Sequence, residues 1–583
     1  MSKTTENSST AQKEPRKGFL ENLYLDKFDK TRFQGLSFPE PDPRAEDIIR
    51  RYQDIIQNYS PAKLEKEGSI PEKLMEDLKE LGLFGLNISE KYGGVGLGLA
   101  GYLSVLRAMA RTDMALALTP TAHLSIGLKG IILFGNEQQK QKYLTQAATG
   151  EMIFAYALTE PGTGSDAQHI QTTATLSDDG THYILSGKKT YITNGGFAGG
   201  LTAFAQMDPE KPGFMGAFIV ETAWDGVEVG KEIPKMGIKI SSTTPISFKN
   251  VKVPLENLLG QPGDGFKIAM TILNYGRLGL GSASAGAMEQ SLKDMFKRSA
   301  TRKQFGMPIR EFELIQEKMV QTAAHSFAST SMTAATASLL EGDHTGPLAI
   351  ESSHVKLYGT TRAWDTLYEA LQTAGGAGYL ATNPYEKRMR DFRVTTVFEG
   401  TSEIHSIYPA LYLMRNLGKR LKGMGRAKQF WYLLTHAFSS PGIRLDYTDP
   451  VMNKASDMAS ELSRSVRKLV HMGLLKYGKG IVSREFYLRR ITNLSMAGYS
   501  LLATLAAVDS MERSRQDASS ELHLLEYLTE EAREVLKSQG RIEDNHLEKT
   551  HKKVFADIVD DFAKSHQSTP RGAPESMTED LSH

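Results

Sequence analysis

Residues 152–166 read MIFAYALTEPGTGSD, and this stretch decides the fold. Its first five residues form an apolar run typical of a buried strand. The hydroxyl groups of Thr159, Thr163 and Ser165 and the free amides around the glycines can bind a polar ring edge and a pyrophosphate, because glycine lets the backbone approach closely. This composition suits a dinucleotide cofactor, although an ordinary strand-to-loop turn explains it as well. The stretch itself carries neither a Walker phosphate loop nor the helix-opening GxGxxG pattern of nicotinamide-binding folds.

Outward from this stretch, strand-like segments continue to about residue 254. They are expected at residues 182–185, 201–205 and 216–220, between glycine-containing turns. Before and after them the apolar residues recur at helical spacing, as Ile48, Tyr52 and Ile55 do. Long Ala-, Leu- and Met-rich helical stretches lie at residues 266–300, 311–340 and 347–374. Helices of this length can form a four-helix bundle.

The predicted fold class is therefore α+β and multidomain. We expect an N-terminal helical domain (41–151), a central β-barrel or sandwich domain (152–258), a four-helix bundle (259–417) and an extra C-terminal helical domain (425–564). Residues 1–40 are predicted to be a partly disordered leader, and residues 565–583 a disordered tail.

Composition excludes several classes of function. The 69 Lys and Arg residues almost balance the 68 Asp and Glu, so no overall field attracts nucleic acid. With no cysteine, the chain has no disulfide, thiolate metal site or iron-sulfur cluster. No histidine pattern has metal-ligand spacing, so no metal is predicted. We expect a cytoplasmic protein without a spanning helix, because the first 16 residues resemble no targeting peptide and the best uncharged segment, 494–508, is short.

A second chemical pattern is KTYITNGG, residues 189–196. In a strand, Tyr191 and Thr193 would share one sheet face, as a ring covering a flat cofactor and a hydroxyl bonding its edge would. An ordinary strand end is the alternative.

A third pattern is VFEGTSEI, residues 397–404. Thr401 can cap a following helix, and Glu403 then lies in the first turn, where the helix dipole favours an acid. Glu399 lies outside the helix among apolar residues, and a low dielectric would raise its pKa and suit a base that removes a carbon-bound proton. A satisfied turn residue is the plain alternative for Glu399.

In this order, and together with RKQFG (302–306) and QTAGGAGY (372–379), these patterns resemble the acyl-CoA dehydrogenase family over about residues 41–417. The helical extension after Gly418 resembles the very-long-chain subgroup. The resemblance implies FAD between the β domain and the bundle, and oxidation of acyl-CoA to trans-2-enoyl-CoA. It also implies electron-transfer flavoprotein as the electron acceptor.

The resemblance further implies that Glu399 removes the α-proton while a hydride leaves for flavin N5, with the backbone amide of Glu399 holding the thioester oxygen. Family members that carry the base on a bundle helix have it at the position of Gly276, so in this chain Glu399 alone matches a base. The cofactor-contacting positions implied are Tyr156, Thr159, Ser165, Tyr191, Thr193, Thr401 and Glu403. Those implied to reach the FAD of a neighbouring subunit, and hence a homodimer, are Arg302, Gln304, Phe305, Gln372, Gly375 and Gly376.

The acyl-CoA path is implied to be lined by Ser165, Asn274 and Arg277. Leu118 and Ala122 occupy positions where medium-chain relatives carry larger polar residues, which predicts a deep apolar pocket for medium to very long chains. Three other functions remain open for a protein with this fold: an acyl-CoA oxidase, a flavin monooxygenase, and a non-catalytic flavoprotein that assists assembly of a respiratory complex. The monooxygenase reaction would not need Glu399.

Two features of the helical regions have competing interpretations. The basic and apolar residues of 464–490 suit either peripheral contact with an anionic membrane or the solvated face of a helical domain. His123 and His405 lie in apolar helical surroundings and are predicted to be structural.

Overall fold

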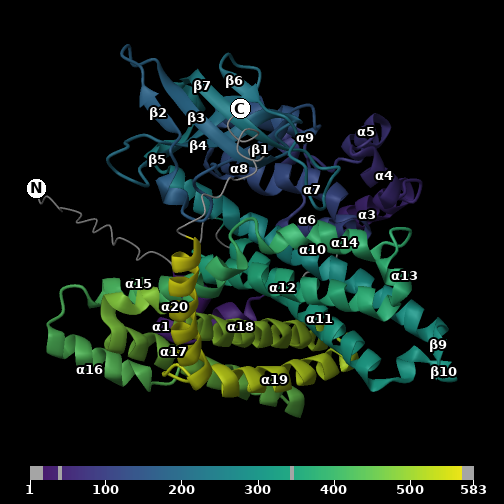
Figure 1. Cartoon of the computed structure of the whole chain (residues 1–583), viewed down its shortest axis with the longest axis vertical. Coiled ribbons are helices and arrows are strands. Elements are labelled where there is room, and N and C mark those ends of the chain that lie inside the picture. Colours follow the sequence, from purple (N-terminus) through teal and green to yellow (C-terminus); the bar gives the residue numbers. More distant parts are fainter. Residues whose placement is uncertain (1–16, 37, 39–41, 342–343, 345–346, 567–583) are drawn as a thin grey trace, which may run out of the picture.

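The computed structural model describes residues 17–36, 38, 42–341, 344 and 347–566. Three layers follow one another along the molecule: a β domain with the first helices beside it, a central helical bundle, and a second helical layer at the far end (Figure 1). The predicted fold class is confirmed.

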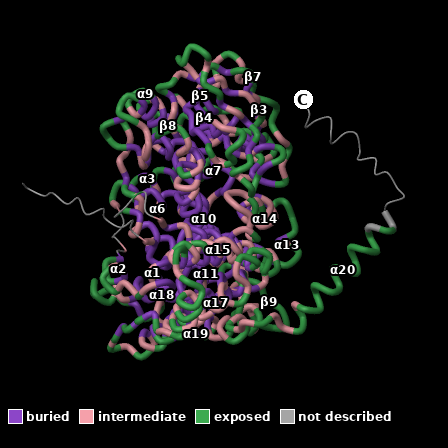
Figure 2. Tube along the Cα trace, turned by 90° about the vertical axis from the view of Figure 1, so that its left-hand side faces the viewer, coloured by how far each residue is buried: buried purple, intermediate pink, exposed green. Residues whose placement is uncertain are grey.

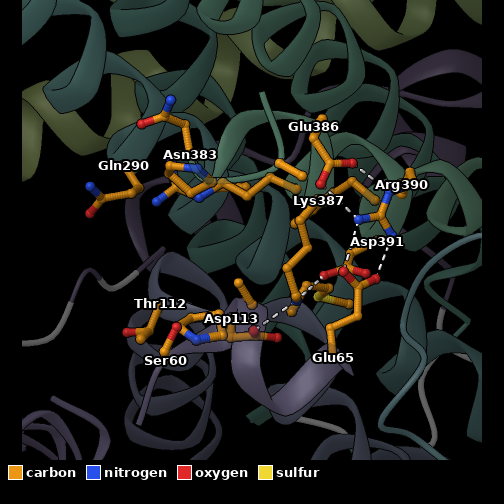
Figure 3. A pocket seen from close by; sticks show the side chains of 18 of the residues that line it. Ser60, Glu65, Thr112, Asp113, Gln290, Asn383, Glu386, Lys387, Arg390 and Asp391 are labelled. Carbon is orange, nitrogen blue, oxygen red and sulfur yellow. Dashed lines mark hydrogen bonds and ion pairs between the residues drawn. The ribbon is translucent and has the colours of Figure 1, made fainter. Parts of the chain in front are cut away.

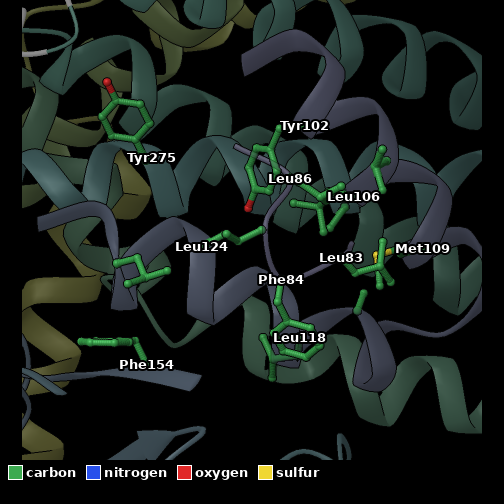
Figure 4. Packing of buried hydrophobic residues seen from close by; sticks show 14 of the residues in the cluster. Leu83, Phe84, Leu86, Tyr102, Leu106, Met109, Leu118, Leu124, Phe154 and Tyr275 are labelled. Carbon is green, nitrogen blue, oxygen red and sulfur yellow. The ribbon is translucent and has the colours of Figure 1, made fainter. Parts of the chain in front are cut away.

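The N-terminal helical domain buries the apolar stripes predicted from its helical spacing. Asp113 caps α7 by accepting hydrogen bonds from the amides of Ala115 and Leu116. Side chains from several segments, among them Leu83, Phe84 and Leu118, meet in one core (Figure 4). The helices are α3 (Pro43–Ile56), α4 (Pro61–Glu67), α5 (Glu72–Glu80), α6 (Leu99–Thr112), α7 (Met114–Ala122), α8 (Lys129–Phe134) and α9 (Glu137–Ala148), with a π-helical turn, η2 (His123–Gly127), after α7.

The β domain is one sheet with the order β6-β7-β3-β2-β4-β5-β8, and β1 pairs in parallel with β4. The strand that opens residues 152–166 is β1, so the Thr- and Gly-rich loop leaves the sheet at the side facing the bundle. The strands are β1 (Ile153–Ala157), β2 (Thr173–Leu176), β3 (His182–Thr193), β4 (Ala198–Gln206), β5 (Met215–Glu221), β6 (Val227–Val229), β7 (Thr243–Pro254) and β8 (Leu258–Gly263).

The bundle contains the long helices expected from composition. Its main helices are α10 (Gly265–Thr301), α11 (Glu313–Glu341), α12 (Ala349–Ala374) and α15 (Ser402–Leu421). A short hairpin of β9 (Lys303–Gln304) and β10 (Met307–Pro308) projects between α10 and α11, and α13 (Gly376–Tyr379) and α14 (Tyr385–Arg393) join α12 to α15.

The extra C-terminal domain packs across the bundle and encloses part of the predicted leader. Its helices are α16 (Arg426–Ala437), α17 (Pro450–Tyr477), α18 (Glu485–Arg513), α19 (Ser519–Gln539) and α20 (His546–His566). The described part of residues 1–40 contains α1 (Phe19–Leu25) and α2 (Lys30–Gln34), and Phe19, Leu20 and Tyr24 lie in the core shared by the bundle and this domain. This segment is therefore structural, while residues 1–16 and 567–583 lie outside the described residues.

Two segments of the described chain, Met114–Phe134 and Glu485–Arg513, are long and apolar enough to cross a membrane by length and composition alone. Their most apolar windows are 78% and 83% buried inside this fold. Because core helices pass the same test, burial in protein accounts for their composition.

Helix α20 leaves the body of the molecule after its first turns (Figure 2). Arg490, itself buried, anchors the start of this helix through Glu548 at 2.8 Å and Asp544 at 3.3 Å. Further along, Phe555 and Ile558 are exposed on one face.

Candidate active site

A cavity of about 880 Å³ lies between the β domain, the N-terminal helices and the bundle. Most of the site residues predicted from sequence line it, although they come from segments up to 283 residues apart, from Leu118 to Thr401. Those that line it are Leu118, Ala122, Tyr156, Thr159, Ser165, Tyr191, Thr193, Arg277, Glu399 and Thr401.

Glu399 lines this cavity from a strained turn. Its φ of 54° and the φ of 95° at Gly400 both lie in the left-handed region, which turns the chain sharply before α15 begins. A Cβ on Gly276 would lie 2.5 Å from both carboxylate oxygens of Glu399, so only glycine there leaves room for this carboxylate. Any side chain at residue 276 would therefore displace the carboxylate of Glu399 from its present position.

The carboxylate of Glu399 is buried and has one oxygen, Oε2, without a hydrogen-bond partner among the described residues. Burial raises the pKa of Glu399 to about 7, while Arg277 and Lys356 act in the opposite direction through their positive charges. The expectation of a raised pKa is thus supported. A carboxylate in this state can accept a proton from a substrate near neutral pH.

Lys356 of α12 is a site residue that sequence reasoning missed. Its Nζ donates a hydrogen bond of 2.6 Å to the carbonyl oxygen of Gly400, and burial lowers the pKa of Lys356 to about 7. A lysine in a helical pattern 43 residues before Glu399 gives no local signal, because only the packing of α12 against the Glu399 turn brings the two together.

His405 is structural, as predicted, and it contacts the Glu399 turn directly. Its Nε2 lies 3.0 Å from the carbonyl oxygen of Glu399 and its Nδ1 lies 2.7 Å from Oγ of Ser353. A neutral ring that donates from Nε2 and accepts at Nδ1 satisfies both contacts, and burial holds the pKa of His405 well below its usual value. His123 is also structural, because its Nδ1 accepts from the amide of Phe154 at 2.9 Å.

Tyr191 and Thr193, which the resemblance implies contact the cofactor, both line the cavity. They do not reach it through the regular strand alternation that was predicted. The pairing of β3 with β7 changes register after Lys189, and Tyr191 has a φ of 57°. The hydroxyl of Tyr156 points elsewhere and donates to the carbonyl oxygen of Ala269 at 3.3 Å.

These residues fit FAD. Hydroxyl-bearing side chains of Thr159, Ser165, Thr193 and Thr243 line one part of the cavity, and Oγ1 of Thr243 is buried without a hydrogen-bond partner among the described residues. Such groups match the polar edge of the isoalloxazine ring and the pyrophosphate of FAD.

Thr401 lines the cavity and also caps a helix, whereas the remaining predicted site residues do not line the cavity. Thr401 caps α15 by accepting from the amide of Ile404 at 3.4 Å, and Glu403 is an exposed first-turn residue, as expected. Asn274 does not line the cavity; its side-chain oxygen accepts from Arg277 at 3.3 Å and so orients that arginine. The six positions predicted to reach a neighbouring subunit are exposed in this chain, at Arg302, Gln304, Phe305, Gln372, Gly375 and Gly376.

The basic stretch 464–490 does not form a continuous outer face. Arg467 is buried and donates to the carbonyl oxygen of Asp26 at 2.6 Å, and the equally buried Arg490 is ion-paired. Leu469 and Val470 lie in the domain core, so the apolar side of this stretch is used for packing. Within the described ranges, no group of three or more His, Cys, Asp or Glu side chains is placed to hold a metal ion.

Family comparisons cover all four domains. Residues 44–151, 155–251 and 263–408 match, in turn, the N-terminal, middle and C-terminal domains of acyl-CoA dehydrogenase. Residues 450–567 match the family described as "ACAD9/ACADV, C-terminal domain".

Individual relatives agree with the family matches. The mitochondrial very long-chain specific acyl-CoA dehydrogenase of Homo sapiens is 34% identical over 529 residues, which cover 85% of this chain and 80% of the human protein. A solved acyl-CoA dehydrogenase complexed with FAD from Bacillus anthracis superposes with a TM-score of 0.79 at 29% identity, covering 96% of each chain. An electron transferring flavoprotein structure from Acidaminococcus fermentans matches with a TM-score of 0.60 at 32% identity, over 65% of this chain and 100% of that one.

The buried carboxylate, the hydroxyl-lined cavity and the family matches through every domain lead to the same assignment. The chain belongs to the acyl-CoA dehydrogenase family and is an FAD-dependent enzyme of that family.

Proposed function

We propose that the protein oxidises medium- to very-long-chain saturated acyl-CoA to trans-2-enoyl-CoA, the first step of fatty acid β-oxidation, with Glu399 as the base. The observation that carries this proposal is the Glu399 carboxylate, which is buried in the cavity with Oε2 unpartnered and a pKa raised to about 7. Identity to the human very long-chain enzyme, and the small side chain of Ala122 in the lining, support the longer substrates.

In this proposal Glu399 accepts the α-proton of the acyl group and holds it on its carboxylate. When bound, FAD supplies a two-electron acceptor for the hydride that leaves the β-carbon. The left-handed turn presents the amide of Glu399, which is the donor we assign to the thioester oxygen as enolate charge develops. Arg277 and Lys356 favour the ionised carboxylate before proton transfer.

The test is an anaerobic titration of the purified holoenzyme with butyryl-, octanoyl- and palmitoyl-CoA. Flavin bleaching strongest with palmitoyl-CoA is expected, and the same titration of Glu399→Gln should leave FAD bound but slow bleaching by about 10²-fold or more. Rapid bleaching of the variant would contradict the assignment of the base. Because Glu399 must be ionised, bleaching by the wild type should also slow as the pH falls below about 7.

We also propose electron-transfer flavoprotein as the acceptor and a homodimer as the working state. The dimer proposal is supported by large apolar side chains that are exposed at the β9–β10 hairpin and the adjoining bundle end, with Phe305 92%, Tyr379 82% and Leu314 73% exposed. An apolar group of this kind is typical of a protein interface.

A further inference from the structure

A second cavity of about 420 Å³ adjoins the active-site cavity. It lies between α4, the α6–α7 junction, α10 and α14, and Figure 3 shows the polar side chains gathered around it. Met114 and Arg390 line both cavities. Met114 is only 4% exposed, so its side chain is packed tightly at the place where it borders both cavities.

Both cavities follow a single face of α10. Residues at helical spacing line the first cavity, from Gly276 beside Glu399 to Ala283, and Ala287 and Gln290 continue the same face into the second cavity. At the rise of an α-helix, Ala283 lies about 10 Å and Gln290 about 21 Å along the axis from Gly276. An extended acyl tail that starts at Glu399 and follows this face meets Met114 before it can reach Gln290.

The two cavities differ in chemistry at this point. Around Met114 the first cavity is lined by apolar side chains, including Leu106, Leu118 and Ala283. The second is bordered by ion pairs: Lys387 bonds Asp113 at 2.8 Å and Asp391 at 2.6 Å (Figure 3).

Arg390 adds a further set of ion pairs on the same border. It pairs with Glu386 at 2.6 Å and also with Glu65 (Figure 3). These ion pairs satisfy one another, and they place charged side chains on the border of the second cavity, which the apolar lining around Met114 in the first cavity lacks.

We propose that Met114 is the floor of the acyl cavity and a specificity-determining residue, which sets the upper limit of acyl length by closing that cavity against the second one. The inference rests on the proposed oxidation of acyl-CoA and names the residue at which the tail ends. Methionine suits this place because its flexible thioether fills an irregular gap without a polar group that needs a partner.

The test compares Met114→Ala and Met114→Phe with the wild-type holoenzyme over saturated acyl-CoAs from octanoyl to the longest soluble chain. In Met114→Ala the optimum of kcat/KM should move to longer chains, with a gain of about four-fold for each further buried methylene. In Met114→Phe the optimum of kcat/KM should move to shorter chains, because the larger phenylalanine ring makes the acyl cavity shallower. If kcat/KM depends on acyl chain length in Met114→Ala in the same way as in the wild type, the proposal is overturned.

The matched control is Met288→Ala, on the same α10 helix. Met288 is fully buried in the core but lines neither cavity, so this variant loses the same side-chain volume without opening the floor. It should leave the chain-length optimum unchanged, and an equal shift in Met288→Ala would contradict a specific role for Met114.

A binding measurement separates this inference from the proposed function. Calorimetric titration of the holoenzymes with trans-2-enoyl-CoAs of increasing length should show the same shift of the affinity optimum in Met114→Ala. If the wild type bleaches with no saturated acyl-CoA, the proposed function fails, and the enoyl-CoA series still decides where the tail ends. If bleaching is normal and neither series shifts, only the role of Met114 fails.

Discussion

At the scale of single residues, Lys356 is one of two cations, with Arg277, that lower the pKa of Glu399 against the larger effect of burial. Removing this charge in Lys356→Met should raise the pKa of Glu399, because a nearby cation favours the ionised carboxylate. In the proposed function flavin reduction needs an ionised Glu399, so the midpoint of the rise of its rate with pH should move to higher pH in the variant. Single-turnover bleaching between pH 6 and 9 measures this shift.

The control for that residue is another buried lysine. Burial lowers the pKa of Lys129 to about 8, and its Nζ lies 4.7 Å from the centre of the Tyr275 ring, but it contributes nothing to the pKa of Glu399. Lys129→Met should therefore leave the pH midpoint of flavin reduction unchanged. A midpoint that moves equally in both variants, or in neither, would disprove the specific effect of Lys356.

At the scale of secondary-structure elements, α1 is attached to α12 through a buried carboxylate. Oε1 of Glu351 accepts a hydrogen bond of 2.7 Å from the amide of Leu20, and Oε2 has no partner among the described residues. Burial raises the pKa of Glu351 from 4.5 to about 7. The folded protein therefore binds more protons than the unfolded chain between these two values, and its free energy of unfolding falls as pH rises through this window.

Glu351→Gln should remove this pH dependence while keeping the acceptor for Leu20. The free energy of unfolding of the wild type, relative to the variant, should fall by on the order of 1–3 kcal/mol between pH 5 and pH 8. Urea unfolding of the two proteins at both pH values measures the difference, from which the shared contribution of Glu399 cancels. A difference independent of pH would show that Glu351 has the same pKa in the folded and unfolded chains, and would contradict the raised value.

At the scale of the whole molecule, the exposed apolar side chains at the bundle end predict association. Phe305→Asp should shift the protein toward the monomer in sedimentation velocity and lower its retention of FAD, because a buried charge at an interface is unfavourable. The matched control is Phe555→Asp on α20, where the ring is 61% exposed. If Phe305→Asp sediments like the wild type, or both variants dissociate alike, the interface does not lie at the hairpin.

Local sequence patterns predicted the elements and most of the residues that line the active-site cavity. Helices α10, α11 and α12 begin and end within a few residues of the predicted stretches, because composition and periodicity are local properties. Thr401 caps α15 as its position before the helix predicts. The Thr- and Gly-rich loop after β1 and the Glu399 turn were likewise recognisable, since each places its functional groups within a few consecutive residues.

Only the tertiary structure decided what depends on packing between distant segments. It brings Lys356 and His405 onto the Glu399 turn and buries α1 beneath the extra domain. It also gives Tyr191 a left-handed backbone where regular strand geometry was expected, and places Met114 between two cavities. These features arise from burial and contact across the fold, and no local pattern of residues encodes which distant surfaces will meet.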